Sequence, residues 1–250
     1  MNTEYPDRRN MEKLDGWLVL DGYEDEPAAF GVPNYVGFHI RYICGVLEER
    51  GIEYTYMTVD QWRSLFKSEL STHEGRKNVR EQMRELDGAI LLAGAVVPGK
   101  YIRGTPISRG ETDSFLSSIP NRIPVICGGW AIRHWRQSGW VSPRSNLFCS
   151  LKDMDATLDH FLSTGKMSHK KRSPDEWSRW ALKGASSKAV VEHPDLLSPN
   201  GSHGPLTYEV ELYQGCVRFK RGCKFCIEPK NCLLYTSPSP RDVEESRMPS

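Results

Sequence analysis

The run Trp17-Leu18-Val19-Leu20, followed by Asp21-Gly22, decides the fold of this chain. Consecutive apolar residues without alternation are typical of a strand that is covered on both faces, as in a parallel sheet. Comparable apolar runs return several times before residue 150. The further predicted strands are Tyr54–Val59, Ala89–Ala93, Pro124–Cys127 and Leu147–Cys149.

Helical patterns separate these strands. Apolar residues recur at helical spacing from Val36 to Leu47, and Gly51 stands where a left-handed cap residue belongs. Three later helices are predicted. One carries Val79, Met83 and Leu86, the second follows Gly129, and the third runs from an Asp153 cap to Gly165. Strands that alternate with helices imply right-handed crossovers. The sequence therefore predicts an α/β domain with a doubly wound, Rossmann-like parallel sheet over residues 14–165.

The composition excludes some classes of partner. The chain has 250 residues, with 33 Lys and Arg against 32 Asp and Glu, so its formal net charge is +1. Without a clear excess of basic residues we expect no nucleic-acid partner. No apolar run reaches the roughly 18–20 residues of a membrane span, and the N-terminus is polar. We expect no membrane association and a cytoplasmic location.

The composition changes after residue 165. Residues 168–174 are basic and polar, and residues 200–205 are rich in chain breakers. We interpret residues 166–205 as an interdomain linker with a solvated basic run and a short packed helix around Trp177 and Trp180. Apolar and acidic residues then alternate from Tyr208 to Leu212, which predicts a short strand with one solvent-exposed face.

Seven cysteines fall into two groups. Cys44, Cys127 and Cys149 are isolated in apolar stretches, where a thiol usually acts as a small buried hydrophobe. The other four crowd into 17 residues, at positions 216, 223, 226 and 232. In a chain of this size without a secretory signal, such crowding indicates a metal or redox site.

Cys216, Cys223 and Cys226 form the pattern C-x6-C-x2-C. Three thiolates on one short loop can each hold one iron of a 4Fe-4S cluster, which leaves the fourth iron open for another ligand. Gly215 and Gly222 would let backbone N–H groups approach the cluster. A zinc site with Cys232 or His203 as fourth ligand is the alternative, although only one Cys-x2-Cys knuckle is clear.

This loop resembles the cluster-binding loop of radical S-adenosylmethionine (radical SAM) enzymes, whose usual motif is C-x3-C-x-aromatic-C. Phe225 stands in the aromatic position, whereas the first spacing is six rather than three. The flanking stretches Tyr213–Cys216 and Cys226–Pro229 resemble an archaeal-type subgroup. Members of that subgroup place a cobalamin-binding-like domain before the radical SAM barrel.

The N-terminal half carries a similar resemblance. Val125-Ile126-Cys127-Gly128-Gly129 resembles the strand and Gly-Gly turn on which cobalamin domains seat their ligand. The stretches Leu20–Tyr23, Asp25–Pro27, Pro98–Tyr101 and Gly104–Pro106 are similar to strand–loop junctions of the subgroup. The resemblance covers roughly residues 15–230, and it implies that residues 206–230 begin a radical SAM (β/α) barrel.

The resemblance implies an enzyme. An electron from reduced ferredoxin or flavodoxin would enter the cluster, and S-adenosyl-L-methionine bound to the open iron would be cleaved to a 5′-deoxyadenosyl radical. Cys216, Cys223 and Cys226 would be the iron ligands and Phe225 would lie against the adenine. The substrate is unknown. With only the start of the barrel, this chain is expected to be inactive alone.

Cobalamin binding depends on the same resemblance, which implies that Gly128 and Gly129 contact the cofactor. The motif D-x-H-x-x-G, which supplies a histidine to cobalt, is absent from the chain. We interpret His39 and His134 as surface or packing residues. Two alternatives stay open: the domain binds a corrinoid without a lower histidine ligand, or it keeps the fold without binding a corrinoid. The glycines do not decide between them, because a tight strand-to-helix turn favours glycine in any doubly wound sheet.

The carboxyl ends of parallel strands are the usual ligand crevice, so residues 21–34, 98–108 and 128–130 are expected around one mouth. Trp130, Trp135 and Trp140 could flank a flat ligand or close a core or domain interface, and we favour the interface. Residues 231–250 have no periodicity and resemble translated sequencing-adapter sequence, so we expect a non-native tail on a gene cut just past the loop.

The alternative to a radical SAM enzyme is a non-catalytic α/β ligand-binding module with a structural zinc-cysteine knuckle.

Overall fold

The computed structural model describes residues 14–22, 35–68, 72–94, 106–150 and 152–193, together with the pairs 207–208, 213–214 and 235–236. The chain divides into two compact units, Met1–Tyr208 and Glu209–Ser250. Nearly all of the described residues belong to the first unit. It contains the predicted α/β domain.

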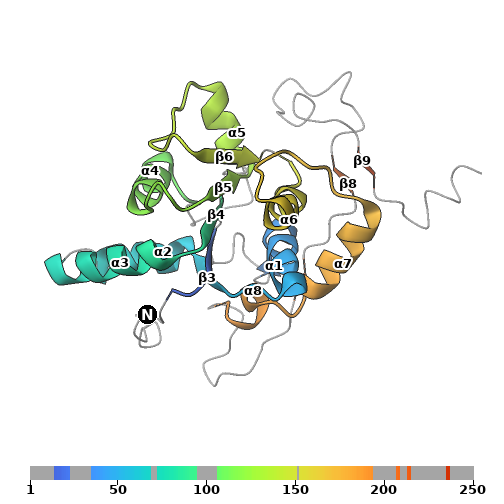
Figure 1. The fold of residues 1–250 in the computed structure, drawn as a ribbon, viewed down its shortest axis with the longest axis horizontal. Coiled ribbons are helices and arrows are strands. Elements are labelled where there is room, and N and C mark those ends of the chain that lie inside the picture. Colours follow the sequence, from blue (N-terminus) through green and yellow to red (C-terminus); the bar gives the residue numbers. More distant parts are fainter. Residues whose placement is uncertain are drawn as a thin grey trace, which may run out of the picture. The chain divides into compact units, whose positions relative to one another are not determined.

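A five-stranded parallel sheet organises the first unit, with strand order β3-β1-β4-β5-β6 (Figure 1). Its strands are β1 (Trp17–Asp21), β3 (Tyr54–Thr58), β4 (Gly88–Leu92), β5 (Val125–Gly128) and β6 (Leu147–Ser150). Each coincides, within one or two residues at either end, with a predicted apolar run. The prediction of an α/β domain with a parallel sheet is confirmed.

Helices cover both faces of this sheet. The helices of the first unit are α1 (Phe38–Arg50), α2 (Val59–Ser68), α3 (His73–Glu85), α4 (Arg109–Ser118), α5 (Trp130–Gln137), α6 (Met154–Thr164), α7 (Pro174–Gly184) and α8 (Lys188–Val191). Figure 1 shows α2, α3 and α4 on one side of the strands and α1, α6, α7 and α8 on the other. Helix α5 belongs with the first group, because Ala131 and Ile132 join the same core. This arrangement follows from right-handed crossovers, because the connection from β1 to β3 runs along the sheet in one direction and those from β3 to β4, β5 and β6 run in the other.

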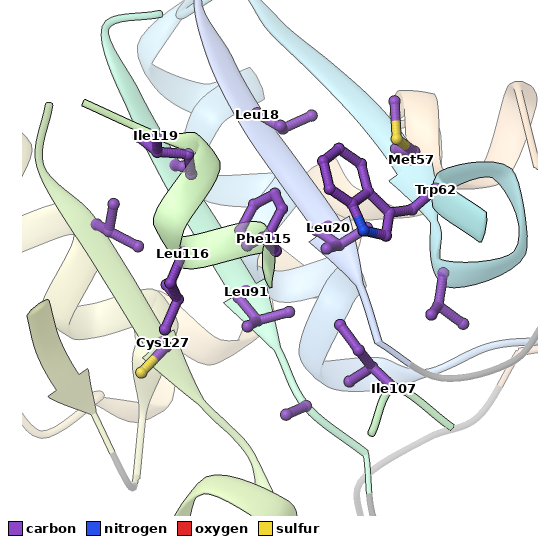
Figure 2. Close-up of a cluster of buried hydrophobic side chains, with 14 of the residues drawn as sticks. Leu18, Leu20, Met57, Trp62, Leu91, Ile107, Phe115, Leu116, Ile119 and Cys127 are labelled. Atoms are coloured by element: carbon purple, nitrogen blue, oxygen red, sulfur yellow. The ribbon is translucent and has the colours of Figure 1, made fainter. Parts of the chain in front are cut away.

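The first face holds a continuous apolar core beneath α2 to α5 (Figure 2). Every second residue of the strands belongs to this core, for example Leu18 and Leu20 of β1. Trp62 of α2 and Phe115 of α4 meet edge to face, with ring centroids 5.3 Å apart. Trp140 belongs to this core and so closes the domain itself, rather than the interface that the sequence suggested.

Helix α1 is buried over its whole middle, from Ile40 to Leu47. The predicted stop is confirmed, because Gly51 adopts the left-handed conformation with φ 62°. The helix begins at Phe38, and Val36 lies instead in β2 (Tyr35–Val36). A helix buried on all sides needs a second partner besides the sheet.

That partner is α7, which lies within the segment interpreted as a linker. Ser173 and Glu176 form a capping box at its start, and Trp177 and Trp180 are buried against the domain. The predicted short packed helix is thus confirmed. The compact unit runs to Tyr208, past the boundary at residue 165, since α7 and α8 both pack on α1.

Helices α1 and α7 approach closely at two glycines. A Cβ on Gly45 would lie 2.2 Å from the Trp180 carbonyl oxygen, and one on Gly184 would lie 2.0 Å from the Arg41 carbonyl oxygen. Real Cβ atoms do not approach a backbone oxygen so closely. The two glycines therefore set the distance between the helices.

Replacing Gly45 by alanine should lower the free energy of unfolding by about 1–3 kcal/mol, because the helices must separate to admit the methyl group. The matched control is Gly110→Ala in α4, where a Cβ would meet nothing within 4 Å. There the gain in helix propensity should stabilise by about 0.5–1 kcal/mol. Urea unfolding measures both, and equal effects at the two positions would contradict the packing shown.

Two smaller pairings involve the C-terminal part of the chain. In the first unit, β2 pairs in parallel with β7 (Thr207–Tyr208). In the second unit, β8 (Tyr213–Gln214) pairs antiparallel with β9 (Tyr235–Thr236), which lies in the predicted non-native tail. The strand expected over residues 208–212 falls largely outside the described residues, as does the rest of the predicted barrel start. Among the described helices none combines the length and apolar character that crossing a bilayer requires.

Candidate functional site

The strand order creates a topological switch point between β1 and β4, where the chain leaves neighbouring strands toward opposite faces. In open α/β sheets, ligands bind outside the carboxyl ends of strands at such a point. Asp21 and Gly22 follow β1 there, and Ala93 follows β4. Of the predicted mouth, residues 23–34 and 98–105 lie outside the described residues.

Backbone hydrogen bonds hold this edge of the sheet together. The Gly22 N–H donates to the Leu92 carbonyl at 2.7 Å, and the Ile107 N–H donates to the Gly22 carbonyl at 2.8 Å. A Cβ on Gly22 would lie 2.3 Å from the Leu92 oxygen. Only glycine lets β1, β4 and the segment at Ile107 come this close.

Gly128 and Gly129, the predicted cofactor-binding turn, lie at the same edge between β5 and α5. Gly129 has φ 95°, and a Cβ there would lie 2.3 Å from the Ala93 oxygen. A Cβ on Gly128 would lie 2.2 Å from the Ser150 oxygen. These contacts within the protein account for both glycines by themselves, and their contact with a cofactor stays a prediction.

A buried polar cluster lies at the carboxyl ends of β1 and β3, on the α1 side of the sheet. The Tyr56 hydroxyl donates to the Asp21 carboxylate at 3.1 Å. The His193 ring lies 6.0 Å from the Tyr56 ring, and all three residues are buried. His193 follows α8, so the segment after α7 completes the cluster.

The cluster combines an imidazole, a phenol and a carboxylate, with Tyr56 in contact with both of the others. Burial lowers the pKa of His193 to about 4, so its imidazole is neutral near pH 7 and can accept a hydrogen bond or a proton. The Asp21 carboxylate accepts a hydrogen bond from the Tyr56 phenol. A buried histidine and carboxylate at a ligand crevice form a candidate site for binding or proton transfer.

The sequence did not point to this cluster. Asp21 was placed at the mouth by its position after β1, but His193 lies in the presumed linker with no motif around it. Tyr56 reads as an ordinary strand residue. Only the packing of α8 against β3 and α1 brings the histidine to the sheet edge.

The buried histidine predicts a pH dependence of stability. Because its folded pKa of about 4 lies below the ordinary 6.5, the unfolded chain takes up the proton first as the pH falls. Stability is therefore lost between about pH 6.5 and 4, and we expect the free energy of unfolding to fall by about 1–2 kcal/mol from pH 7 to 5 through His193. His39, whose pKa burial and the Arg172 cation lower to about 3, adds to this loss.

Urea unfolding of His193→Phe at pH 7 and pH 5 isolates the contribution. The variant should lose about 1–2 kcal/mol less than the parent between the two pH values. His134→Gln on the exposed side of α5 is the matched control and should keep the parental loss. An unchanged pH dependence in His193→Phe would contradict a neutral buried imidazole.

A second polar cluster lies at the start of α6. Arg172 is 2% exposed, and its Nη1 lies 2.6 Å from the Asp155 Oδ2. Its guanidinium also stacks over the rings of Tyr42 and Trp177, at 4.8 and 4.5 Å from their centroids. The interpretation of residues 168–174 as a solvated basic run is wrong at this position, because Arg172 joins α6, α1 and α7.

The predicted iron ligands Cys216, Cys223 and Cys226 lie outside the described residues, and so does Phe225. The described pair nearest to them in sequence is β8, which ends two residues before Cys216. In the part of the chain that the structure describes, no three His, Cys, Asp or Glu side chains gather as metal ligands would. Three cysteines there, Cys44, Cys127 and Cys149, have free thiols.

Comparison with known proteins finds two long archaeal relatives. The chain is 30% identical over 239 residues to an uncharacterized protein of Methanocaldococcus jannaschii, a match that covers 90% of the chain and 40% of that protein. It is 29% identical over 220 residues to an uncharacterized protein of Archaeoglobus fulgidus, with 88% and 35% covered. No family model matches the chain. The chain thus spans less than half the length of these curated relatives.

Proposed function

We propose that this chain is the N-terminal part of a radical SAM enzyme, in which an α/β domain precedes a loop that binds a 4Fe-4S cluster and S-adenosyl-L-methionine. The observation that carries the proposal is the spacing of Cys216, Cys223 and Cys226, with Phe225 in the aromatic position. Three thiolates on one loop suit a cubane cluster with one open iron.

Two further observations support the proposal. The α/β sheet and its helices form a unit that ends at Tyr208, directly before the cysteine loop, as expected if a separate catalytic domain begins there. The archaeal relatives each extend well beyond the matched part, which leaves room for a complete barrel. A complete (β/α) barrel domain commonly needs 200 residues or more.

The residues of the loop have distinct roles in this proposal. The three cysteines hold iron, and Phe225 lies against the adenine of the cofactor. Lys220, Arg221 and Lys224 offset the negative charge of the cluster. When bound, the cluster supplies the electron, taken from reduced ferredoxin or flavodoxin, that cleaves S-adenosyl-L-methionine to a 5′-deoxyadenosyl radical. The substrate class stays open.

Within the α/β domain, Asp21, Tyr56 and His193 form a separate polar cluster that can bind a polar group of a ligand. Corrinoid binding is not part of this proposal. The Gly128-Gly129 turn is explained by the carbonyl oxygens of Ala93 and Ser150, and the chain lacks the histidine motif for cobalt.

Anaerobic reconstitution of the complete protein with iron and sulfide tests the proposal. We expect about four irons and four sulfides per chain, with the broad visible absorption of such clusters. The competing hypothesis, a ligand-binding module with a structural zinc knuckle, predicts one tightly bound zinc and no sulfide. Stoichiometric zinc that iron and sulfide do not replace would overturn the proposal.

A further inference from the structure

Cys127 and Cys149 face each other on neighbouring strands. They are paired residues in the register of β5 and β6, and their Sγ atoms lie 3.4 Å apart. Neighbouring strands run about 4.8 Å apart, which falls within the range of roughly 4.4–6.8 Å between Cα atoms that a disulfide spans. Bond formation requires the two sulfurs to move from 3.4 Å to about 2 Å apart.

The two thiols differ in their surroundings. Cys127 is fully buried at the margin of the core cluster (Figure 2), whereas Cys149 is partly exposed. Burial raises the pKa of the Cys127 thiol. The hydrogen bond from Cys127 lowers the pKa of Cys149, and the Arg136 cation adds to this effect. Because Cys149 is partly exposed, it is the sulfur that a dissolved disulfide can reach.

We propose that Cys127 and Cys149 form a reversible thiol–disulfide site that reacts with low-molecular-weight disulfides. The Cys149 thiolate attacks one sulfur of the disulfide RSSR, which forms a mixed disulfide and releases one RS⁻. The Cys127 thiol then loses its proton and attacks the Cys149 sulfur, which forms the Cys127–Cys149 bond and releases the second RS⁻. In the balance, two protein thiols are oxidised and RSSR is reduced to two RSH.

The position of the pair gives this modification a structural consequence. Cys127 directly precedes Gly128, whose carbonyl accepts from the Ala93 N–H at 2.9 Å. Cys149 directly precedes Ser150, whose carbonyl lies against Gly128. A disulfide between β5 and β6 therefore constrains the carboxyl ends of the strands, where the candidate site lies. Disulfides in reducing compartments are usually transient or redox-sensing, which suits this role.

The test uses the complete protein in which Cys216, Cys223 and Cys226 are replaced by serine, so that its result does not depend on cluster binding. The protein is exposed to glutathione disulfide, quenched in acid, denatured and labelled with N-ethylmaleimide, and its peptides are identified by mass. We expect a Cys127–Cys149 linkage and about tenfold less labelling at both positions than at the buried Cys44, which serves as internal control.

Two variants separate the steps. Cys127→Ala should accumulate a stable glutathione adduct on Cys149, because the resolving thiol is missing. Cys149→Ala should leave Cys127 unmodified, because it is buried. Circular dichroism confirms that each variant is folded. Labelling at Cys127 and Cys149 equal to that at Cys44, or an adduct that persists on Cys149 beside an intact Cys127, would overturn the proposal.

Discussion

Replacing Cys223 by alanine is expected to abolish iron–sulfur binding by the complete protein, with iron and sulfide falling from about four per chain to near zero. With two of three thiolates left, a cubane cluster has two irons without a protein ligand. Cys216→Ala and Cys226→Ala should behave alike. Iron and sulfide analysis after anaerobic reconstitution measures the loss.

Cys232→Ala, made in the 250-residue chain because Cys232 lies in the predicted non-native tail, is the control that separates the two hypotheses on this loop. Cys232 lies outside the C-x6-C-x2-C pattern, so the cluster hypothesis predicts an unchanged iron content in the variant. A zinc site that used Cys232 as its fourth ligand would lose metal on this substitution. Loss of metal in Cys232→Ala, or full iron content in Cys223→Ala, would contradict the assigned ligands.

Replacing Arg172 by methionine should lower the free energy of unfolding by about 3–5 kcal/mol at neutral pH. The substitution keeps an unbranched apolar side chain but removes the cation that lies 2.6 Å from Asp155. Asp155 is 3% exposed, so its carboxylate is then buried without its cation. Urea unfolding at a fixed temperature measures the difference.

The loss should depend on pH in a defined direction. Burial already raises the pKa of Asp155, and Arg172 is the cation that opposes this rise. Without Arg172 the pKa rises further, so the carboxyl is protonated in the folded state at pH values where the unfolded chain has lost the proton. The destabilisation is therefore larger at high pH and becomes smaller as the pH falls toward the unfolded pKa.

Two controls accompany this prediction. Arg179→Ala removes a surface ion pair with Glu49, in which Arg179 is 57% exposed, and should change stability by less than about 1 kcal/mol. The double variant Arg172→Met with Asp155→Leu should recover most of the loss, because no buried charge remains. Equal losses in the single and double variants would show that packing rather than charge accounts for the effect.

The sequence predicted the sheet well because parallel strands covered on both faces leave a simple trace of consecutive apolar residues. The end of α1 at Gly51 was predicted correctly as well, because the left-handed conformation of a helix cap favours glycine. Helix α4 was not predicted, although Ser108 and Glu111 form the capping box that marks its start. That signal was present in the sequence and could have been used.

Other features depend on contacts between distant segments. Arg172 reads as part of a basic run, and its burial becomes visible only when Asp155 and the rings of α1 and α7 surround it. The pairing of Cys127 with Cys149 requires the register of β5 and β6, which isolated apolar runs do not specify. His193 enters the sheet edge only through the packing of α8.

Incubation of the reconstituted complete protein with S-adenosyl-L-methionine and a strong reductant, without air, tests the central claim most directly. The account predicts that 5′-deoxyadenosine and methionine form in equal amounts, and that neither forms in Cys223→Ala. An intact protein that binds no iron and sulfide, and leaves S-adenosyl-L-methionine uncleaved after reduction, would contradict it.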